Sequence, residues 1–234
     1  MSAEIKKKLS LLLLDIIFPK KCAACGKLDT LFCEKCRSKI IFLKTQNCPY
    51  CLKITVRGRI CPNCKSTEES PLTGVYVTAH FDDPLKEVIH KYKYDFVRAL
   101  RDDLADLIWP YMEDFSKNTV LTCVPSSPKR MAWRGYNQAE EIAGILAQHT
   151  GMRFYPNLLK RTDYKTPQTQ LTRKERFKNV ANAFQINRKV DLDGKQIIIF
   201  DDLVTSGATL GACAKEIRKL GATRVWGFVL ARNK

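Results

Sequence analysis

The sequence has no apolar run long enough to span a membrane. Its leucine-rich stretch at residues 9–18 is interrupted by Asp15 and is far shorter than the ~20 residues that a transmembrane helix needs. Lys6, Lys7 and Lys8 precede it as in a signal peptide, but no convincing cleavage site follows. We therefore expect residues 1–20 to form an amphipathic helix docked on the rest of the protein. A helix lying on a membrane surface is the alternative.

The glycine patterns of common nucleotide-binding loops are also missing. Neither G-x-x-x-x-G-K nor G-x-G-x-x-G is present, so ATP-driven and dinucleotide-dependent activities have no support. Histidine is scarce, with three residues, and neither His80 nor His90 has neighbours that suggest a catalytic or metal cluster.

Positive charge, in contrast, is abundant. Residues 1–73 carry 14 Lys/Arg and 6 Asp/Glu, and residues 74–234 carry 26 and 18, so each part has a net charge of +8. The basicity is therefore not confined to a tail. It favours a polyanionic partner, with nucleic acid the first candidate. The alternative is a basic protein whose charge serves only solubility and a small anionic ligand.

Eight of the ten cysteines form four Cys-x-x-Cys pairs: Cys22/Cys25, Cys33/Cys36, Cys48/Cys51 and Cys61/Cys64. Two such pairs complete a tetrahedral Cys₄ site, so we expect two structural Zn²⁺ ions and a reducing compartment, the cytoplasm. The spacing leaves open whether the pairing is sequential or cross-braced. Closed Cys₄ sites have no open coordination position, which argues against catalysis by zinc. Cys123 and Cys213 lie in apolar patterns and are expected in the core.

The stretch from Gln196 to Leu210 predicts the main site. Four apolar residues indicate a buried parallel strand, and Asp201 and Asp202 follow, where open α/β sheets place their ligands. The next residues, Thr205, Ser206, Gly207, Ala208 and Thr209, form a small hydroxyl-rich loop before a helical pattern. Its backbone N–H groups suit a phosphate, whereas the two carboxylates suit sugar hydroxyls, Mg²⁺, or both. Together they indicate a ribose 5-phosphate site.

Cations and aromatic rings gather in a second segment, residues 125–138, which we expect to be a loop. Lys129, Arg130 and Arg134 are candidates for binding a pyrophosphate, and Trp133 and Tyr136 offer faces for base stacking. A third segment, residues 160–178, carries seven Lys/Arg and two Asp/Glu and is expected to be a mobile loop before a short helix.

Apolar periodicity predicts an α/β fold with a mostly parallel sheet and helices on both faces. Strands are expected at residues 75–80, 119–124, 183–186, 196–200 and 223–230, and helices at 83–93, 97–115 and 139–149. The predicted domains are the N-terminal helix (1–20), a double zinc ribbon (21–66) and an α/β domain (74–234), joined by a polar linker.

Two resemblances follow from these residues. The stretch 196–210 resembles the phosphoribosyl pyrophosphate (PRPP) motif of type I phosphoribosyltransferases. The whole chain resembles the ComF family of competence proteins. The shared features are the four Cys-x-x-Cys pairs (called knuckles below), the I-H-K-Y-K-Y element (89–94), the R-G-Y-N-Q element (134–138) and the PRPP motif. Val204 and Ser206 depart mildly from the family pattern.

The family resemblance implies a type I phosphoribosyltransferase fold behind a double zinc ribbon, acting on single-stranded DNA in natural transformation. It implies that Asp201 and Asp202 hold the ribose hydroxyls, with Mg²⁺ accompanying PRPP, and that residues 205–209 hold the 5-phosphate. A competence helicase is a partner that the family context suggests. No stable membrane span is expected.

Two functions remain open on the sequence alone. One is a cytoplasmic DNA-binding competence protein with a PRPP-type site, and the other is an active phosphoribosyltransferase of nucleotide or base metabolism. An amidotransferase is disfavoured, because a glutaminase would need a large domain of its own with an N-terminal nucleophilic cysteine.

Overall fold

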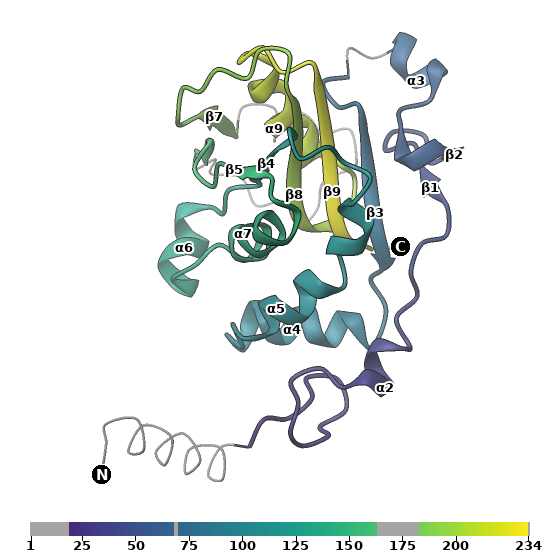
Figure 1. The fold of residues 1–234 in the computed structure, drawn as a ribbon, viewed down its shortest axis with the longest axis vertical. Helices are drawn as coiled ribbons and strands as arrows, with labels where there is room; N and C mark the ends of the chain where they lie inside the picture. The colour runs from purple at the N-terminus through teal and green to yellow at the C-terminus, as the bar shows by residue number, and fades with distance from the viewer. Residues whose placement is uncertain (1–18, 68–69, 163–182, 234) are drawn as a thin grey trace. The chain divides into compact units, whose positions relative to one another are not determined.

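The computed structural model describes residues 19–67, 70–162 and 183–233 (Figure 1). The chain divides into two compact units, one of the residues up to Ile40 with Asp82–Asp103, and one of Ile41–Phe81 with the chain from Leu104 onward. The helix predicted at 1–20, and most of the basic segment 160–178, lie outside the described residues. In the described ranges no helix is both long and apolar enough to cross a membrane.

The first unit combines a cysteine-rich segment with helix α4. The segment contains the short α2 (Glu34–Arg37), whose Arg37 forms an ion pair with Asp103 and donates a hydrogen bond of 3.2 Å to the Phe32 carbonyl. Helix α4 (Leu85–Tyr94) buries one face at helical spacing: Leu85, Val88, Ile89 and Tyr92. The helix predicted at 83–93 is confirmed.

The second unit is built on a five-stranded, all-parallel sheet in the order β3-β9-β8-β4-β5. The strands are β3 (Gly74–His80), β4 (Val120–Cys123), β5 (Arg153–Phe154), β8 (Gln196–Val204) and β9 (Arg224–Arg232). Strand β8 is central, and its Ile197–Phe200 run is fully buried, as expected of a parallel strand covered on both faces.

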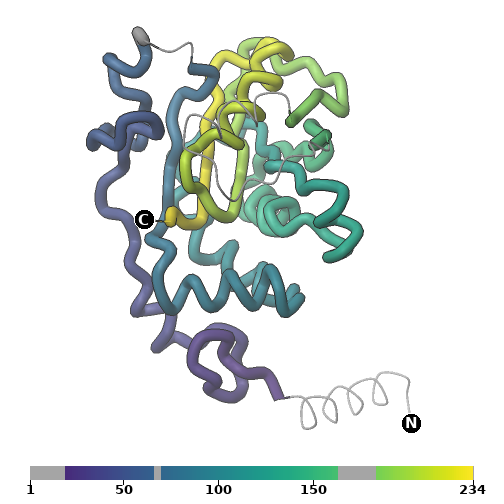
Figure 2. Tube along the Cα trace, turned by 180° about the vertical axis from the view of Figure 1, so that it is seen from behind, coloured from purple at the N-terminus to yellow at the C-terminus, as the bar shows by residue number. Residues whose placement is uncertain are grey.

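Helices cover both faces of this sheet (Figures 1 and 2). Helix α9 (Ala208–Arg218) packs through Leu210, Cys213 and Ile217 in the aliphatic cluster that includes Ile197 and Ile199. Helix α7 (Gln138–Thr150) packs on β4 and β8 and also contacts η2 (Trp109–Met112). The predicted α/β class, with a parallel sheet between helices, is confirmed.

Strand β3 lies at one edge of the sheet, and residues 41–46 cover it. Leu43 N–H donates to the Thr78 carbonyl (3.0 Å), and His80 N–H donates to the Ile41 carbonyl (2.9 Å). The buried Gln46 side chain continues the pattern, because its amide bonds both the N–H and the carbonyl of Val77 at 2.9 Å. A side chain here takes the place of a further strand.

Smaller elements complete the described chain. The second cysteine-rich segment contains β1 (Gln46–Asn47) paired with β2 (Ile54–Thr55), then η1 (Val56–Gly58) and α3 (Pro62–Thr67). Strand β6 (Leu159–Arg161) pairs antiparallel with β7 (Phe184–Ile186). The strand predicted at 183–186 is therefore present, but it belongs to a separate two-stranded sheet.

Two predictions of local structure were wrong. The helix expected at 97–115 is broken into α5 (Leu100–Asp106) and η2, because Pro110 has no N–H for a continuing helix. The segment 125–138, expected as a loop, contains α6 (Pro128–Arg134). Ser127 caps this helix by accepting a hydrogen bond from Arg130 N–H (3.3 Å), and Pro128 stands at its first position, a common start signal.

Two glycines let the second cysteine-rich segment approach β3 closely. Gly58 has φ +72°, and a Cβ there would lie 2.0 Å from the Val75 carbonyl oxygen. A Cβ at Gly74 would lie 2.6 Å from the Gly58 carbonyl oxygen. Backbone meets backbone at this point, so neither position tolerates a side chain without local movement.

We predict that Gly58→Ala lowers the free energy of unfolding by about 2 kcal/mol or more, from left-handed strain and the clash with Val75. The matched control is Gly211→Ala in α9, where a Cβ meets nothing within 4 Å. That change should be neutral or stabilise by up to about 1 kcal/mol. Urea unfolding followed by circular dichroism measures both, and equal stabilities of the two variants would contradict the prediction.

Candidate functional site

The two acidic residues lie near the C-terminal end of the central strand, β8. Strand β8 pairs with β4 only as far as Phe200, whose carbonyl accepts a hydrogen bond from Val124 N–H (2.9 Å). Beyond that point β8 continues to Val204 beside β9 alone. Asp201 and Asp202 therefore occupy the part of β8 where β4 has already ended, at the carboxyl edge of the sheet.

The two carboxylates differ in their surroundings. Successive side chains of a strand point to opposite faces, so Asp201 and Asp202 project on the two sides of β8. Asp202 is 8% exposed, whereas Asp201 is half-buried. Asp201 Oδ1 accepts a hydrogen bond from Asp202 N–H (3.0 Å), which fixes the first carboxylate against the strand.

The hydroxyl-rich segment after β8 forms a tight turn into α9. Gly207 is the N-cap of the helix with φ +76°, a conformation that favours glycine. Ala208 N–H donates to Ser206 Oγ at 3.4 Å. Ala208 and Thr209, expected in the loop, are instead the first residues of α9. Their N–H groups thus stand at a helix N-terminus, which attracts anions.

A zinc-ribbon proline lies beside this turn. A Cβ built on Gly207 would be 4.0 Å from Pro49 Cβ, which is ordinary van der Waals contact. Pro49 stands between Cys48 and Cys51 of the third knuckle. The turn between β8 and α9 is therefore bordered by the second cysteine-rich segment, a neighbour that the sequence did not predict.

The segment after β4 reaches the same edge of the sheet and is held there by Asn137. The buried Asn137 side chain donates to the Val124 carbonyl (3.0 Å), and its Oδ1 accepts from Ser126 Oγ (3.1 Å). The turn into α6 is thus closed at its base. Sequence reasoning missed this positioning role, although an asparagine directly before a helical pattern is a typical cap signal.

The predicted cations are carried by α6. Lys129 and Arg130 are exposed in its first turn, and Arg134 is half-buried in its last, with its guanidinium 5.4 Å from the centre of the Trp133 ring. Trp133 is 56% exposed and can stack on a base. Tyr136 is only 5% exposed, so the prediction that its ring offers a stacking face was wrong.

The two lone cysteines lie under the acidic pair. Burial raises the pKa of the Cys123 thiol well above its usual value, and the carboxylates of Glu140 and Asp201 raise it further. Burial likewise raises the pKa of Cys213, with Asp201 again contributing. Both thiols therefore stay protonated as small core side chains, as predicted, and Asp201 lies within electrostatic reach of β4 and α9.

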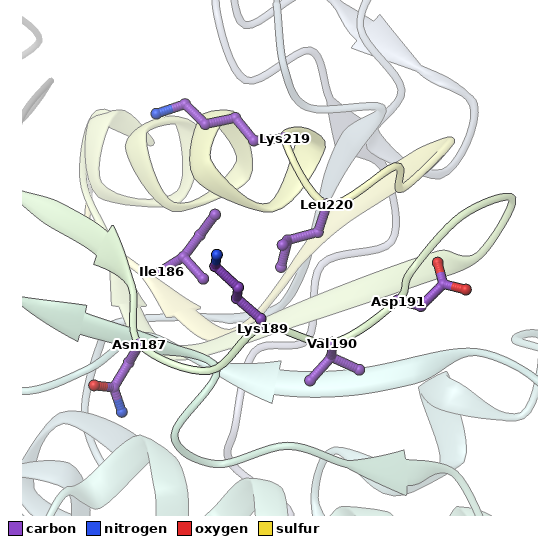
Figure 3. A pocket seen from close by; sticks show the side chains of 7 residues that line it. All are labelled: Ile186, Asn187, Lys189, Val190, Asp191, Lys219 and Leu220. Carbon is purple, nitrogen blue, oxygen red and sulfur yellow. The ribbon is translucent and has the colours of Figure 1, made fainter.

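A cavity of about 620 Å³ lies at the other end of α9 (Figure 3). The segment after β7 and the end of α9 line it: Ile186, Asn187, Lys189, Val190, Asp191, Lys219 and Leu220. Since α9 has 11 residues, its two ends are about 16 Å apart. None of the predicted site residues lines this cavity.

The eight knuckle cysteines form two clusters. Cys22, Cys25, Cys33 and Cys36 have all four sulfurs within 4.8 Å of one another, and so do Cys48, Cys51, Cys61 and Cys64. The Cys25–Cys33 and Cys51–Cys61 sulfurs are 3.6 and 3.5 Å apart. Zn–S bonds of about 2.3 Å in a tetrahedron give about 3.8 Å, so each cluster fits one zinc ion. The pairing is sequential.

The thiols of each cluster perturb one another. Burial raises the pKa of Cys22, but backbone amides, that of Cys33 foremost, lower it by more, to about 6. Burial raises the pKa of Cys36 to about 12, with the sulfurs of Cys25, Cys33 and Cys22 contributing. Cys48 and Cys64 show the same two shifts. A divalent cation relieves this crowding by binding all four sulfurs as thiolates.

Known proteins resemble this chain both in its cysteine-rich segment and over most of its length. A family model described as a double zinc ribbon domain matches residues 13–65. Competence protein F of Haemophilus influenzae is 27% identical over 212 residues, covering 85% of this chain and 90% of that protein. Competence protein ComFC of Streptococcus pneumoniae is 29% identical over 206 residues, covering 87% and 89%. Over most of its length the chain is therefore similar to ComF-type competence proteins.

Other relatives have different names. The DNA utilization protein YhgH of Escherichia coli K12 is 26% identical to this chain over 193 residues, covering 80% of the chain and 84% of the relative. Among solved structures, an adenine phosphoribosyltransferase from Thermoanaerobacter pseudethanolicus has a TM-score of 0.39 and 15% identity, covering 59% and 83%. The predicted order along the chain, a zinc-ribbon segment followed by a parallel α/β sheet, is confirmed.

We predict that the protein purifies with two Zn²⁺ ions and that Cys48→Ser lowers this to one. Chelation should lower the thermal midpoint, because the short segments around each cluster have little other support. Zinc content by a chromogenic chelator and circular dichroism measure both effects. Cys213→Ala, which removes a core cysteine, is the matched control and should keep two ions. An unchanged thermal midpoint after complete zinc removal would contradict the prediction.

Proposed function

We propose that this protein acts in DNA uptake, binding single-stranded DNA and carrying a PRPP-type site. The relatives named competence and DNA utilization proteins support the role in DNA handling. The net charge of +16 supports a polyanionic partner. A reducing compartment, the cytoplasm, is proposed from the two Cys₄ clusters.

The observation that best supports a PRPP-type site is that two carboxylates and a helix N-terminus come together at the carboxyl end of β8. Two carboxylates there are followed within five residues by a glycine-capped helix start. Carboxylates accept hydrogen bonds from sugar hydroxyls, and helix-terminal N–H groups bind phosphate. One ribose 5-phosphate satisfies both demands, because it carries a diol and a phosphate on a single sugar.

Each residue has a proposed role. Asp201 and Asp202 hold the ribose hydroxyls, and residues 205–209 hold the 5-phosphate. Lys129, Arg130 and Arg134 bind the pyrophosphate, because α6 follows β4 at the same sheet edge. Mg²⁺ bound with PRPP would neutralise part of the pyrophosphate charge near the carboxylates.

Turnover would need no nucleophile from the protein. Phosphoribosyl transfer builds positive charge at the sugar C1, which nearby carboxylates stabilise, and positioning does the remaining work. The alternative function, a phosphoribosyltransferase of nucleotide or base metabolism, uses the same residues. The residues of the site therefore do not distinguish a protein that only binds PRPP from one that also transfers its phosphoribosyl group. Only a measurement of product formation does so. A competence helicase is the proposed protein partner.

We predict that PRPP with Mg²⁺ binds the wild-type protein and that Asp201→Asn with Asp202→Asn weakens binding at least tenfold. Hydrogen bonds to a charged group contribute about 1.5–3 kcal/mol each, and the amides remove that charge without changing shape. Isothermal titration calorimetry measures the affinity. Asp191→Asn, in the cavity at the far end of α9, is the matched control and should bind normally.

Two outcomes would revise the proposal. Unchanged affinity in the double variant would remove the site assignment. Release of pyrophosphate from PRPP in the presence of one nucleobase would favour the transferase alternative over a binding role alone.

We also predict that affinity for a dT oligonucleotide falls steeply with salt, because phosphate contacts release counterions. Lys129→Gln with Arg130→Gln should reduce the magnitude of the slope of log K against log[salt] by about 1.4, at about 0.7 for each contact on a single strand. Fluorescence anisotropy at four salt concentrations measures the slope.

The control removes the same charge elsewhere. Lys189→Gln with Lys219→Gln, at the far end of α9, should leave the slope unchanged. Absence of binding at physiological salt would contradict the DNA-binding role, and equal slopes for the two double variants would place the phosphate contacts away from α6.

A further inference from the structure

The end of α4 and the turn after it present two aromatic rings to solvent. Tyr94 is 46% exposed and Phe96 is 42% exposed, although Tyr92 on the opposite face of the helix is fully buried. The segment belongs to the I-H-K-Y-K-Y element and its continuation, to which neither the sheet edge nor the zinc clusters gives a role. Two exposed rings separated by a single residue are a feature that folding alone does not require.

The backbone holds Phe96 in an unusual conformation. Its φ is +58°, which is rare for a residue with a bulky side chain. Hydrogen bonds fix the turn on both sides, since Asp95 N–H (3.1 Å) and Val97 N–H (3.3 Å) both bond to the Lys91 carbonyl. Glycine would occupy this position without strain. A strained, hydrogen-bonded turn that displays an aromatic ring points to a function for that ring.

A third ring and several charged residues lie close to the two exposed rings in the sequence. The His90 and Tyr94 rings lie 4.7 Å apart between centroids at 40°. Asp95, which stands between Tyr94 and Phe96, forms an ion pair with Lys91 (2.7 Å), which offsets its charge. Lys93 and the exposed Arg98 flank Tyr94 and Phe96 in the sequence. Rings with adjacent cations suit bases attached to a phosphate backbone.

We propose that Tyr94 and Phe96 form a stacking platform for the bases of single-stranded nucleic acid, with Lys93 and Arg98 contacting its phosphates. The proposal rests on the single-stranded DNA binding proposed above and assigns it a surface outside α6. Nucleic acid is favoured over a protein partner because the exposed side chains are rings with a cation before them, Lys93, and one after them, Arg98. Every base has a face that stacks on such a ring, so the platform is sequence-tolerant.

The test uses a variant that keeps the turn. Phe96→Gly suits the φ of +58°, and combined with Tyr94→Ala it removes both rings. We expect its affinity for a dT 20-mer to fall about tenfold to hundredfold, with an unchanged salt slope because no charge is lost. Tyr94→Phe keeps a ring and should bind as the wild type does. Fluorescence anisotropy on the full chain measures all three.

A second oligonucleotide isolates stacking from charge. An abasic 20-mer has the same phosphates without bases, so the wild type should prefer dT over the abasic strand, and the double variant should lose that preference. The matched control is Ile54→Ala with Val56→Ala, which removes two exposed aliphatic side chains (70% and 77% exposed) and should keep the preference.

The outcomes separate the two proposals. If the wild type binds dT and the double variant keeps its affinity and preference, the platform is overturned while DNA binding stands, and the rings become a candidate protein-docking surface. If the wild type binds neither strand, the DNA-binding function itself is overturned and the platform with it.

Discussion

The candidate site depends on one mismatch in strand length. Strand β8 has parallel partners on both sides up to Phe200, but only β9 accompanies its last four residues. The strand is rigid there because β9 still pairs with it, and it is accessible because β4 has ended. Carboxylates placed at that point are held in position without being sealed inside the core. The chain leaving β4 emerges at the same edge of the sheet and continues into α6.

Asn137 links this opening to the rest of the second unit. Its amide is buried and bonds the end of β4 and the first serine after it, while the next residue begins α7. One side chain thus joins a strand end, a turn and a helix start. Because an unpaired buried amide is costly, the three elements are expected to keep their relation during ligand binding.

Much of the fold was readable from local sequence, and the failures have identifiable causes. The run Ile197–Phe200 and the periodic pattern of α7 gave correct elements, since burial on both faces or on one stripe leaves a clear signature. Two prolines explain the two errors in helix prediction. Pro110 prevents α5 from continuing to residue 115, and Pro128 starts α6 in a segment that was expected to be a loop. Strand β7 was found, but its partner strand was not, because pairing is a tertiary property. The pairing of the cysteines on zinc could not be predicted from their spacing and needed the sulfur positions.

The candidate site was less predictable than the fold, because residue type does not reveal burial. Tyr136 was expected to be available for stacking, but its ring is buried. Asn137 is also buried, and its side chain positions the turn after β4. The ligand roles at the sheet edge stay predictions.

The cover over β3 has a consequence for handling the protein. An edge strand offers unpaired N–H and carbonyl groups to any other chain, and here Ile41, Leu43 and the Gln46 amide occupy them. Gln46 also begins β1, two residues before the first cysteine of the second cluster. Stripping a metal from that cluster would loosen the cover and expose β3. Metal-depleted material would then self-associate through strand addition, with turbidity growing more steeply than protein concentration, so that an oligomer seen after harsh purification need not be a native assembly.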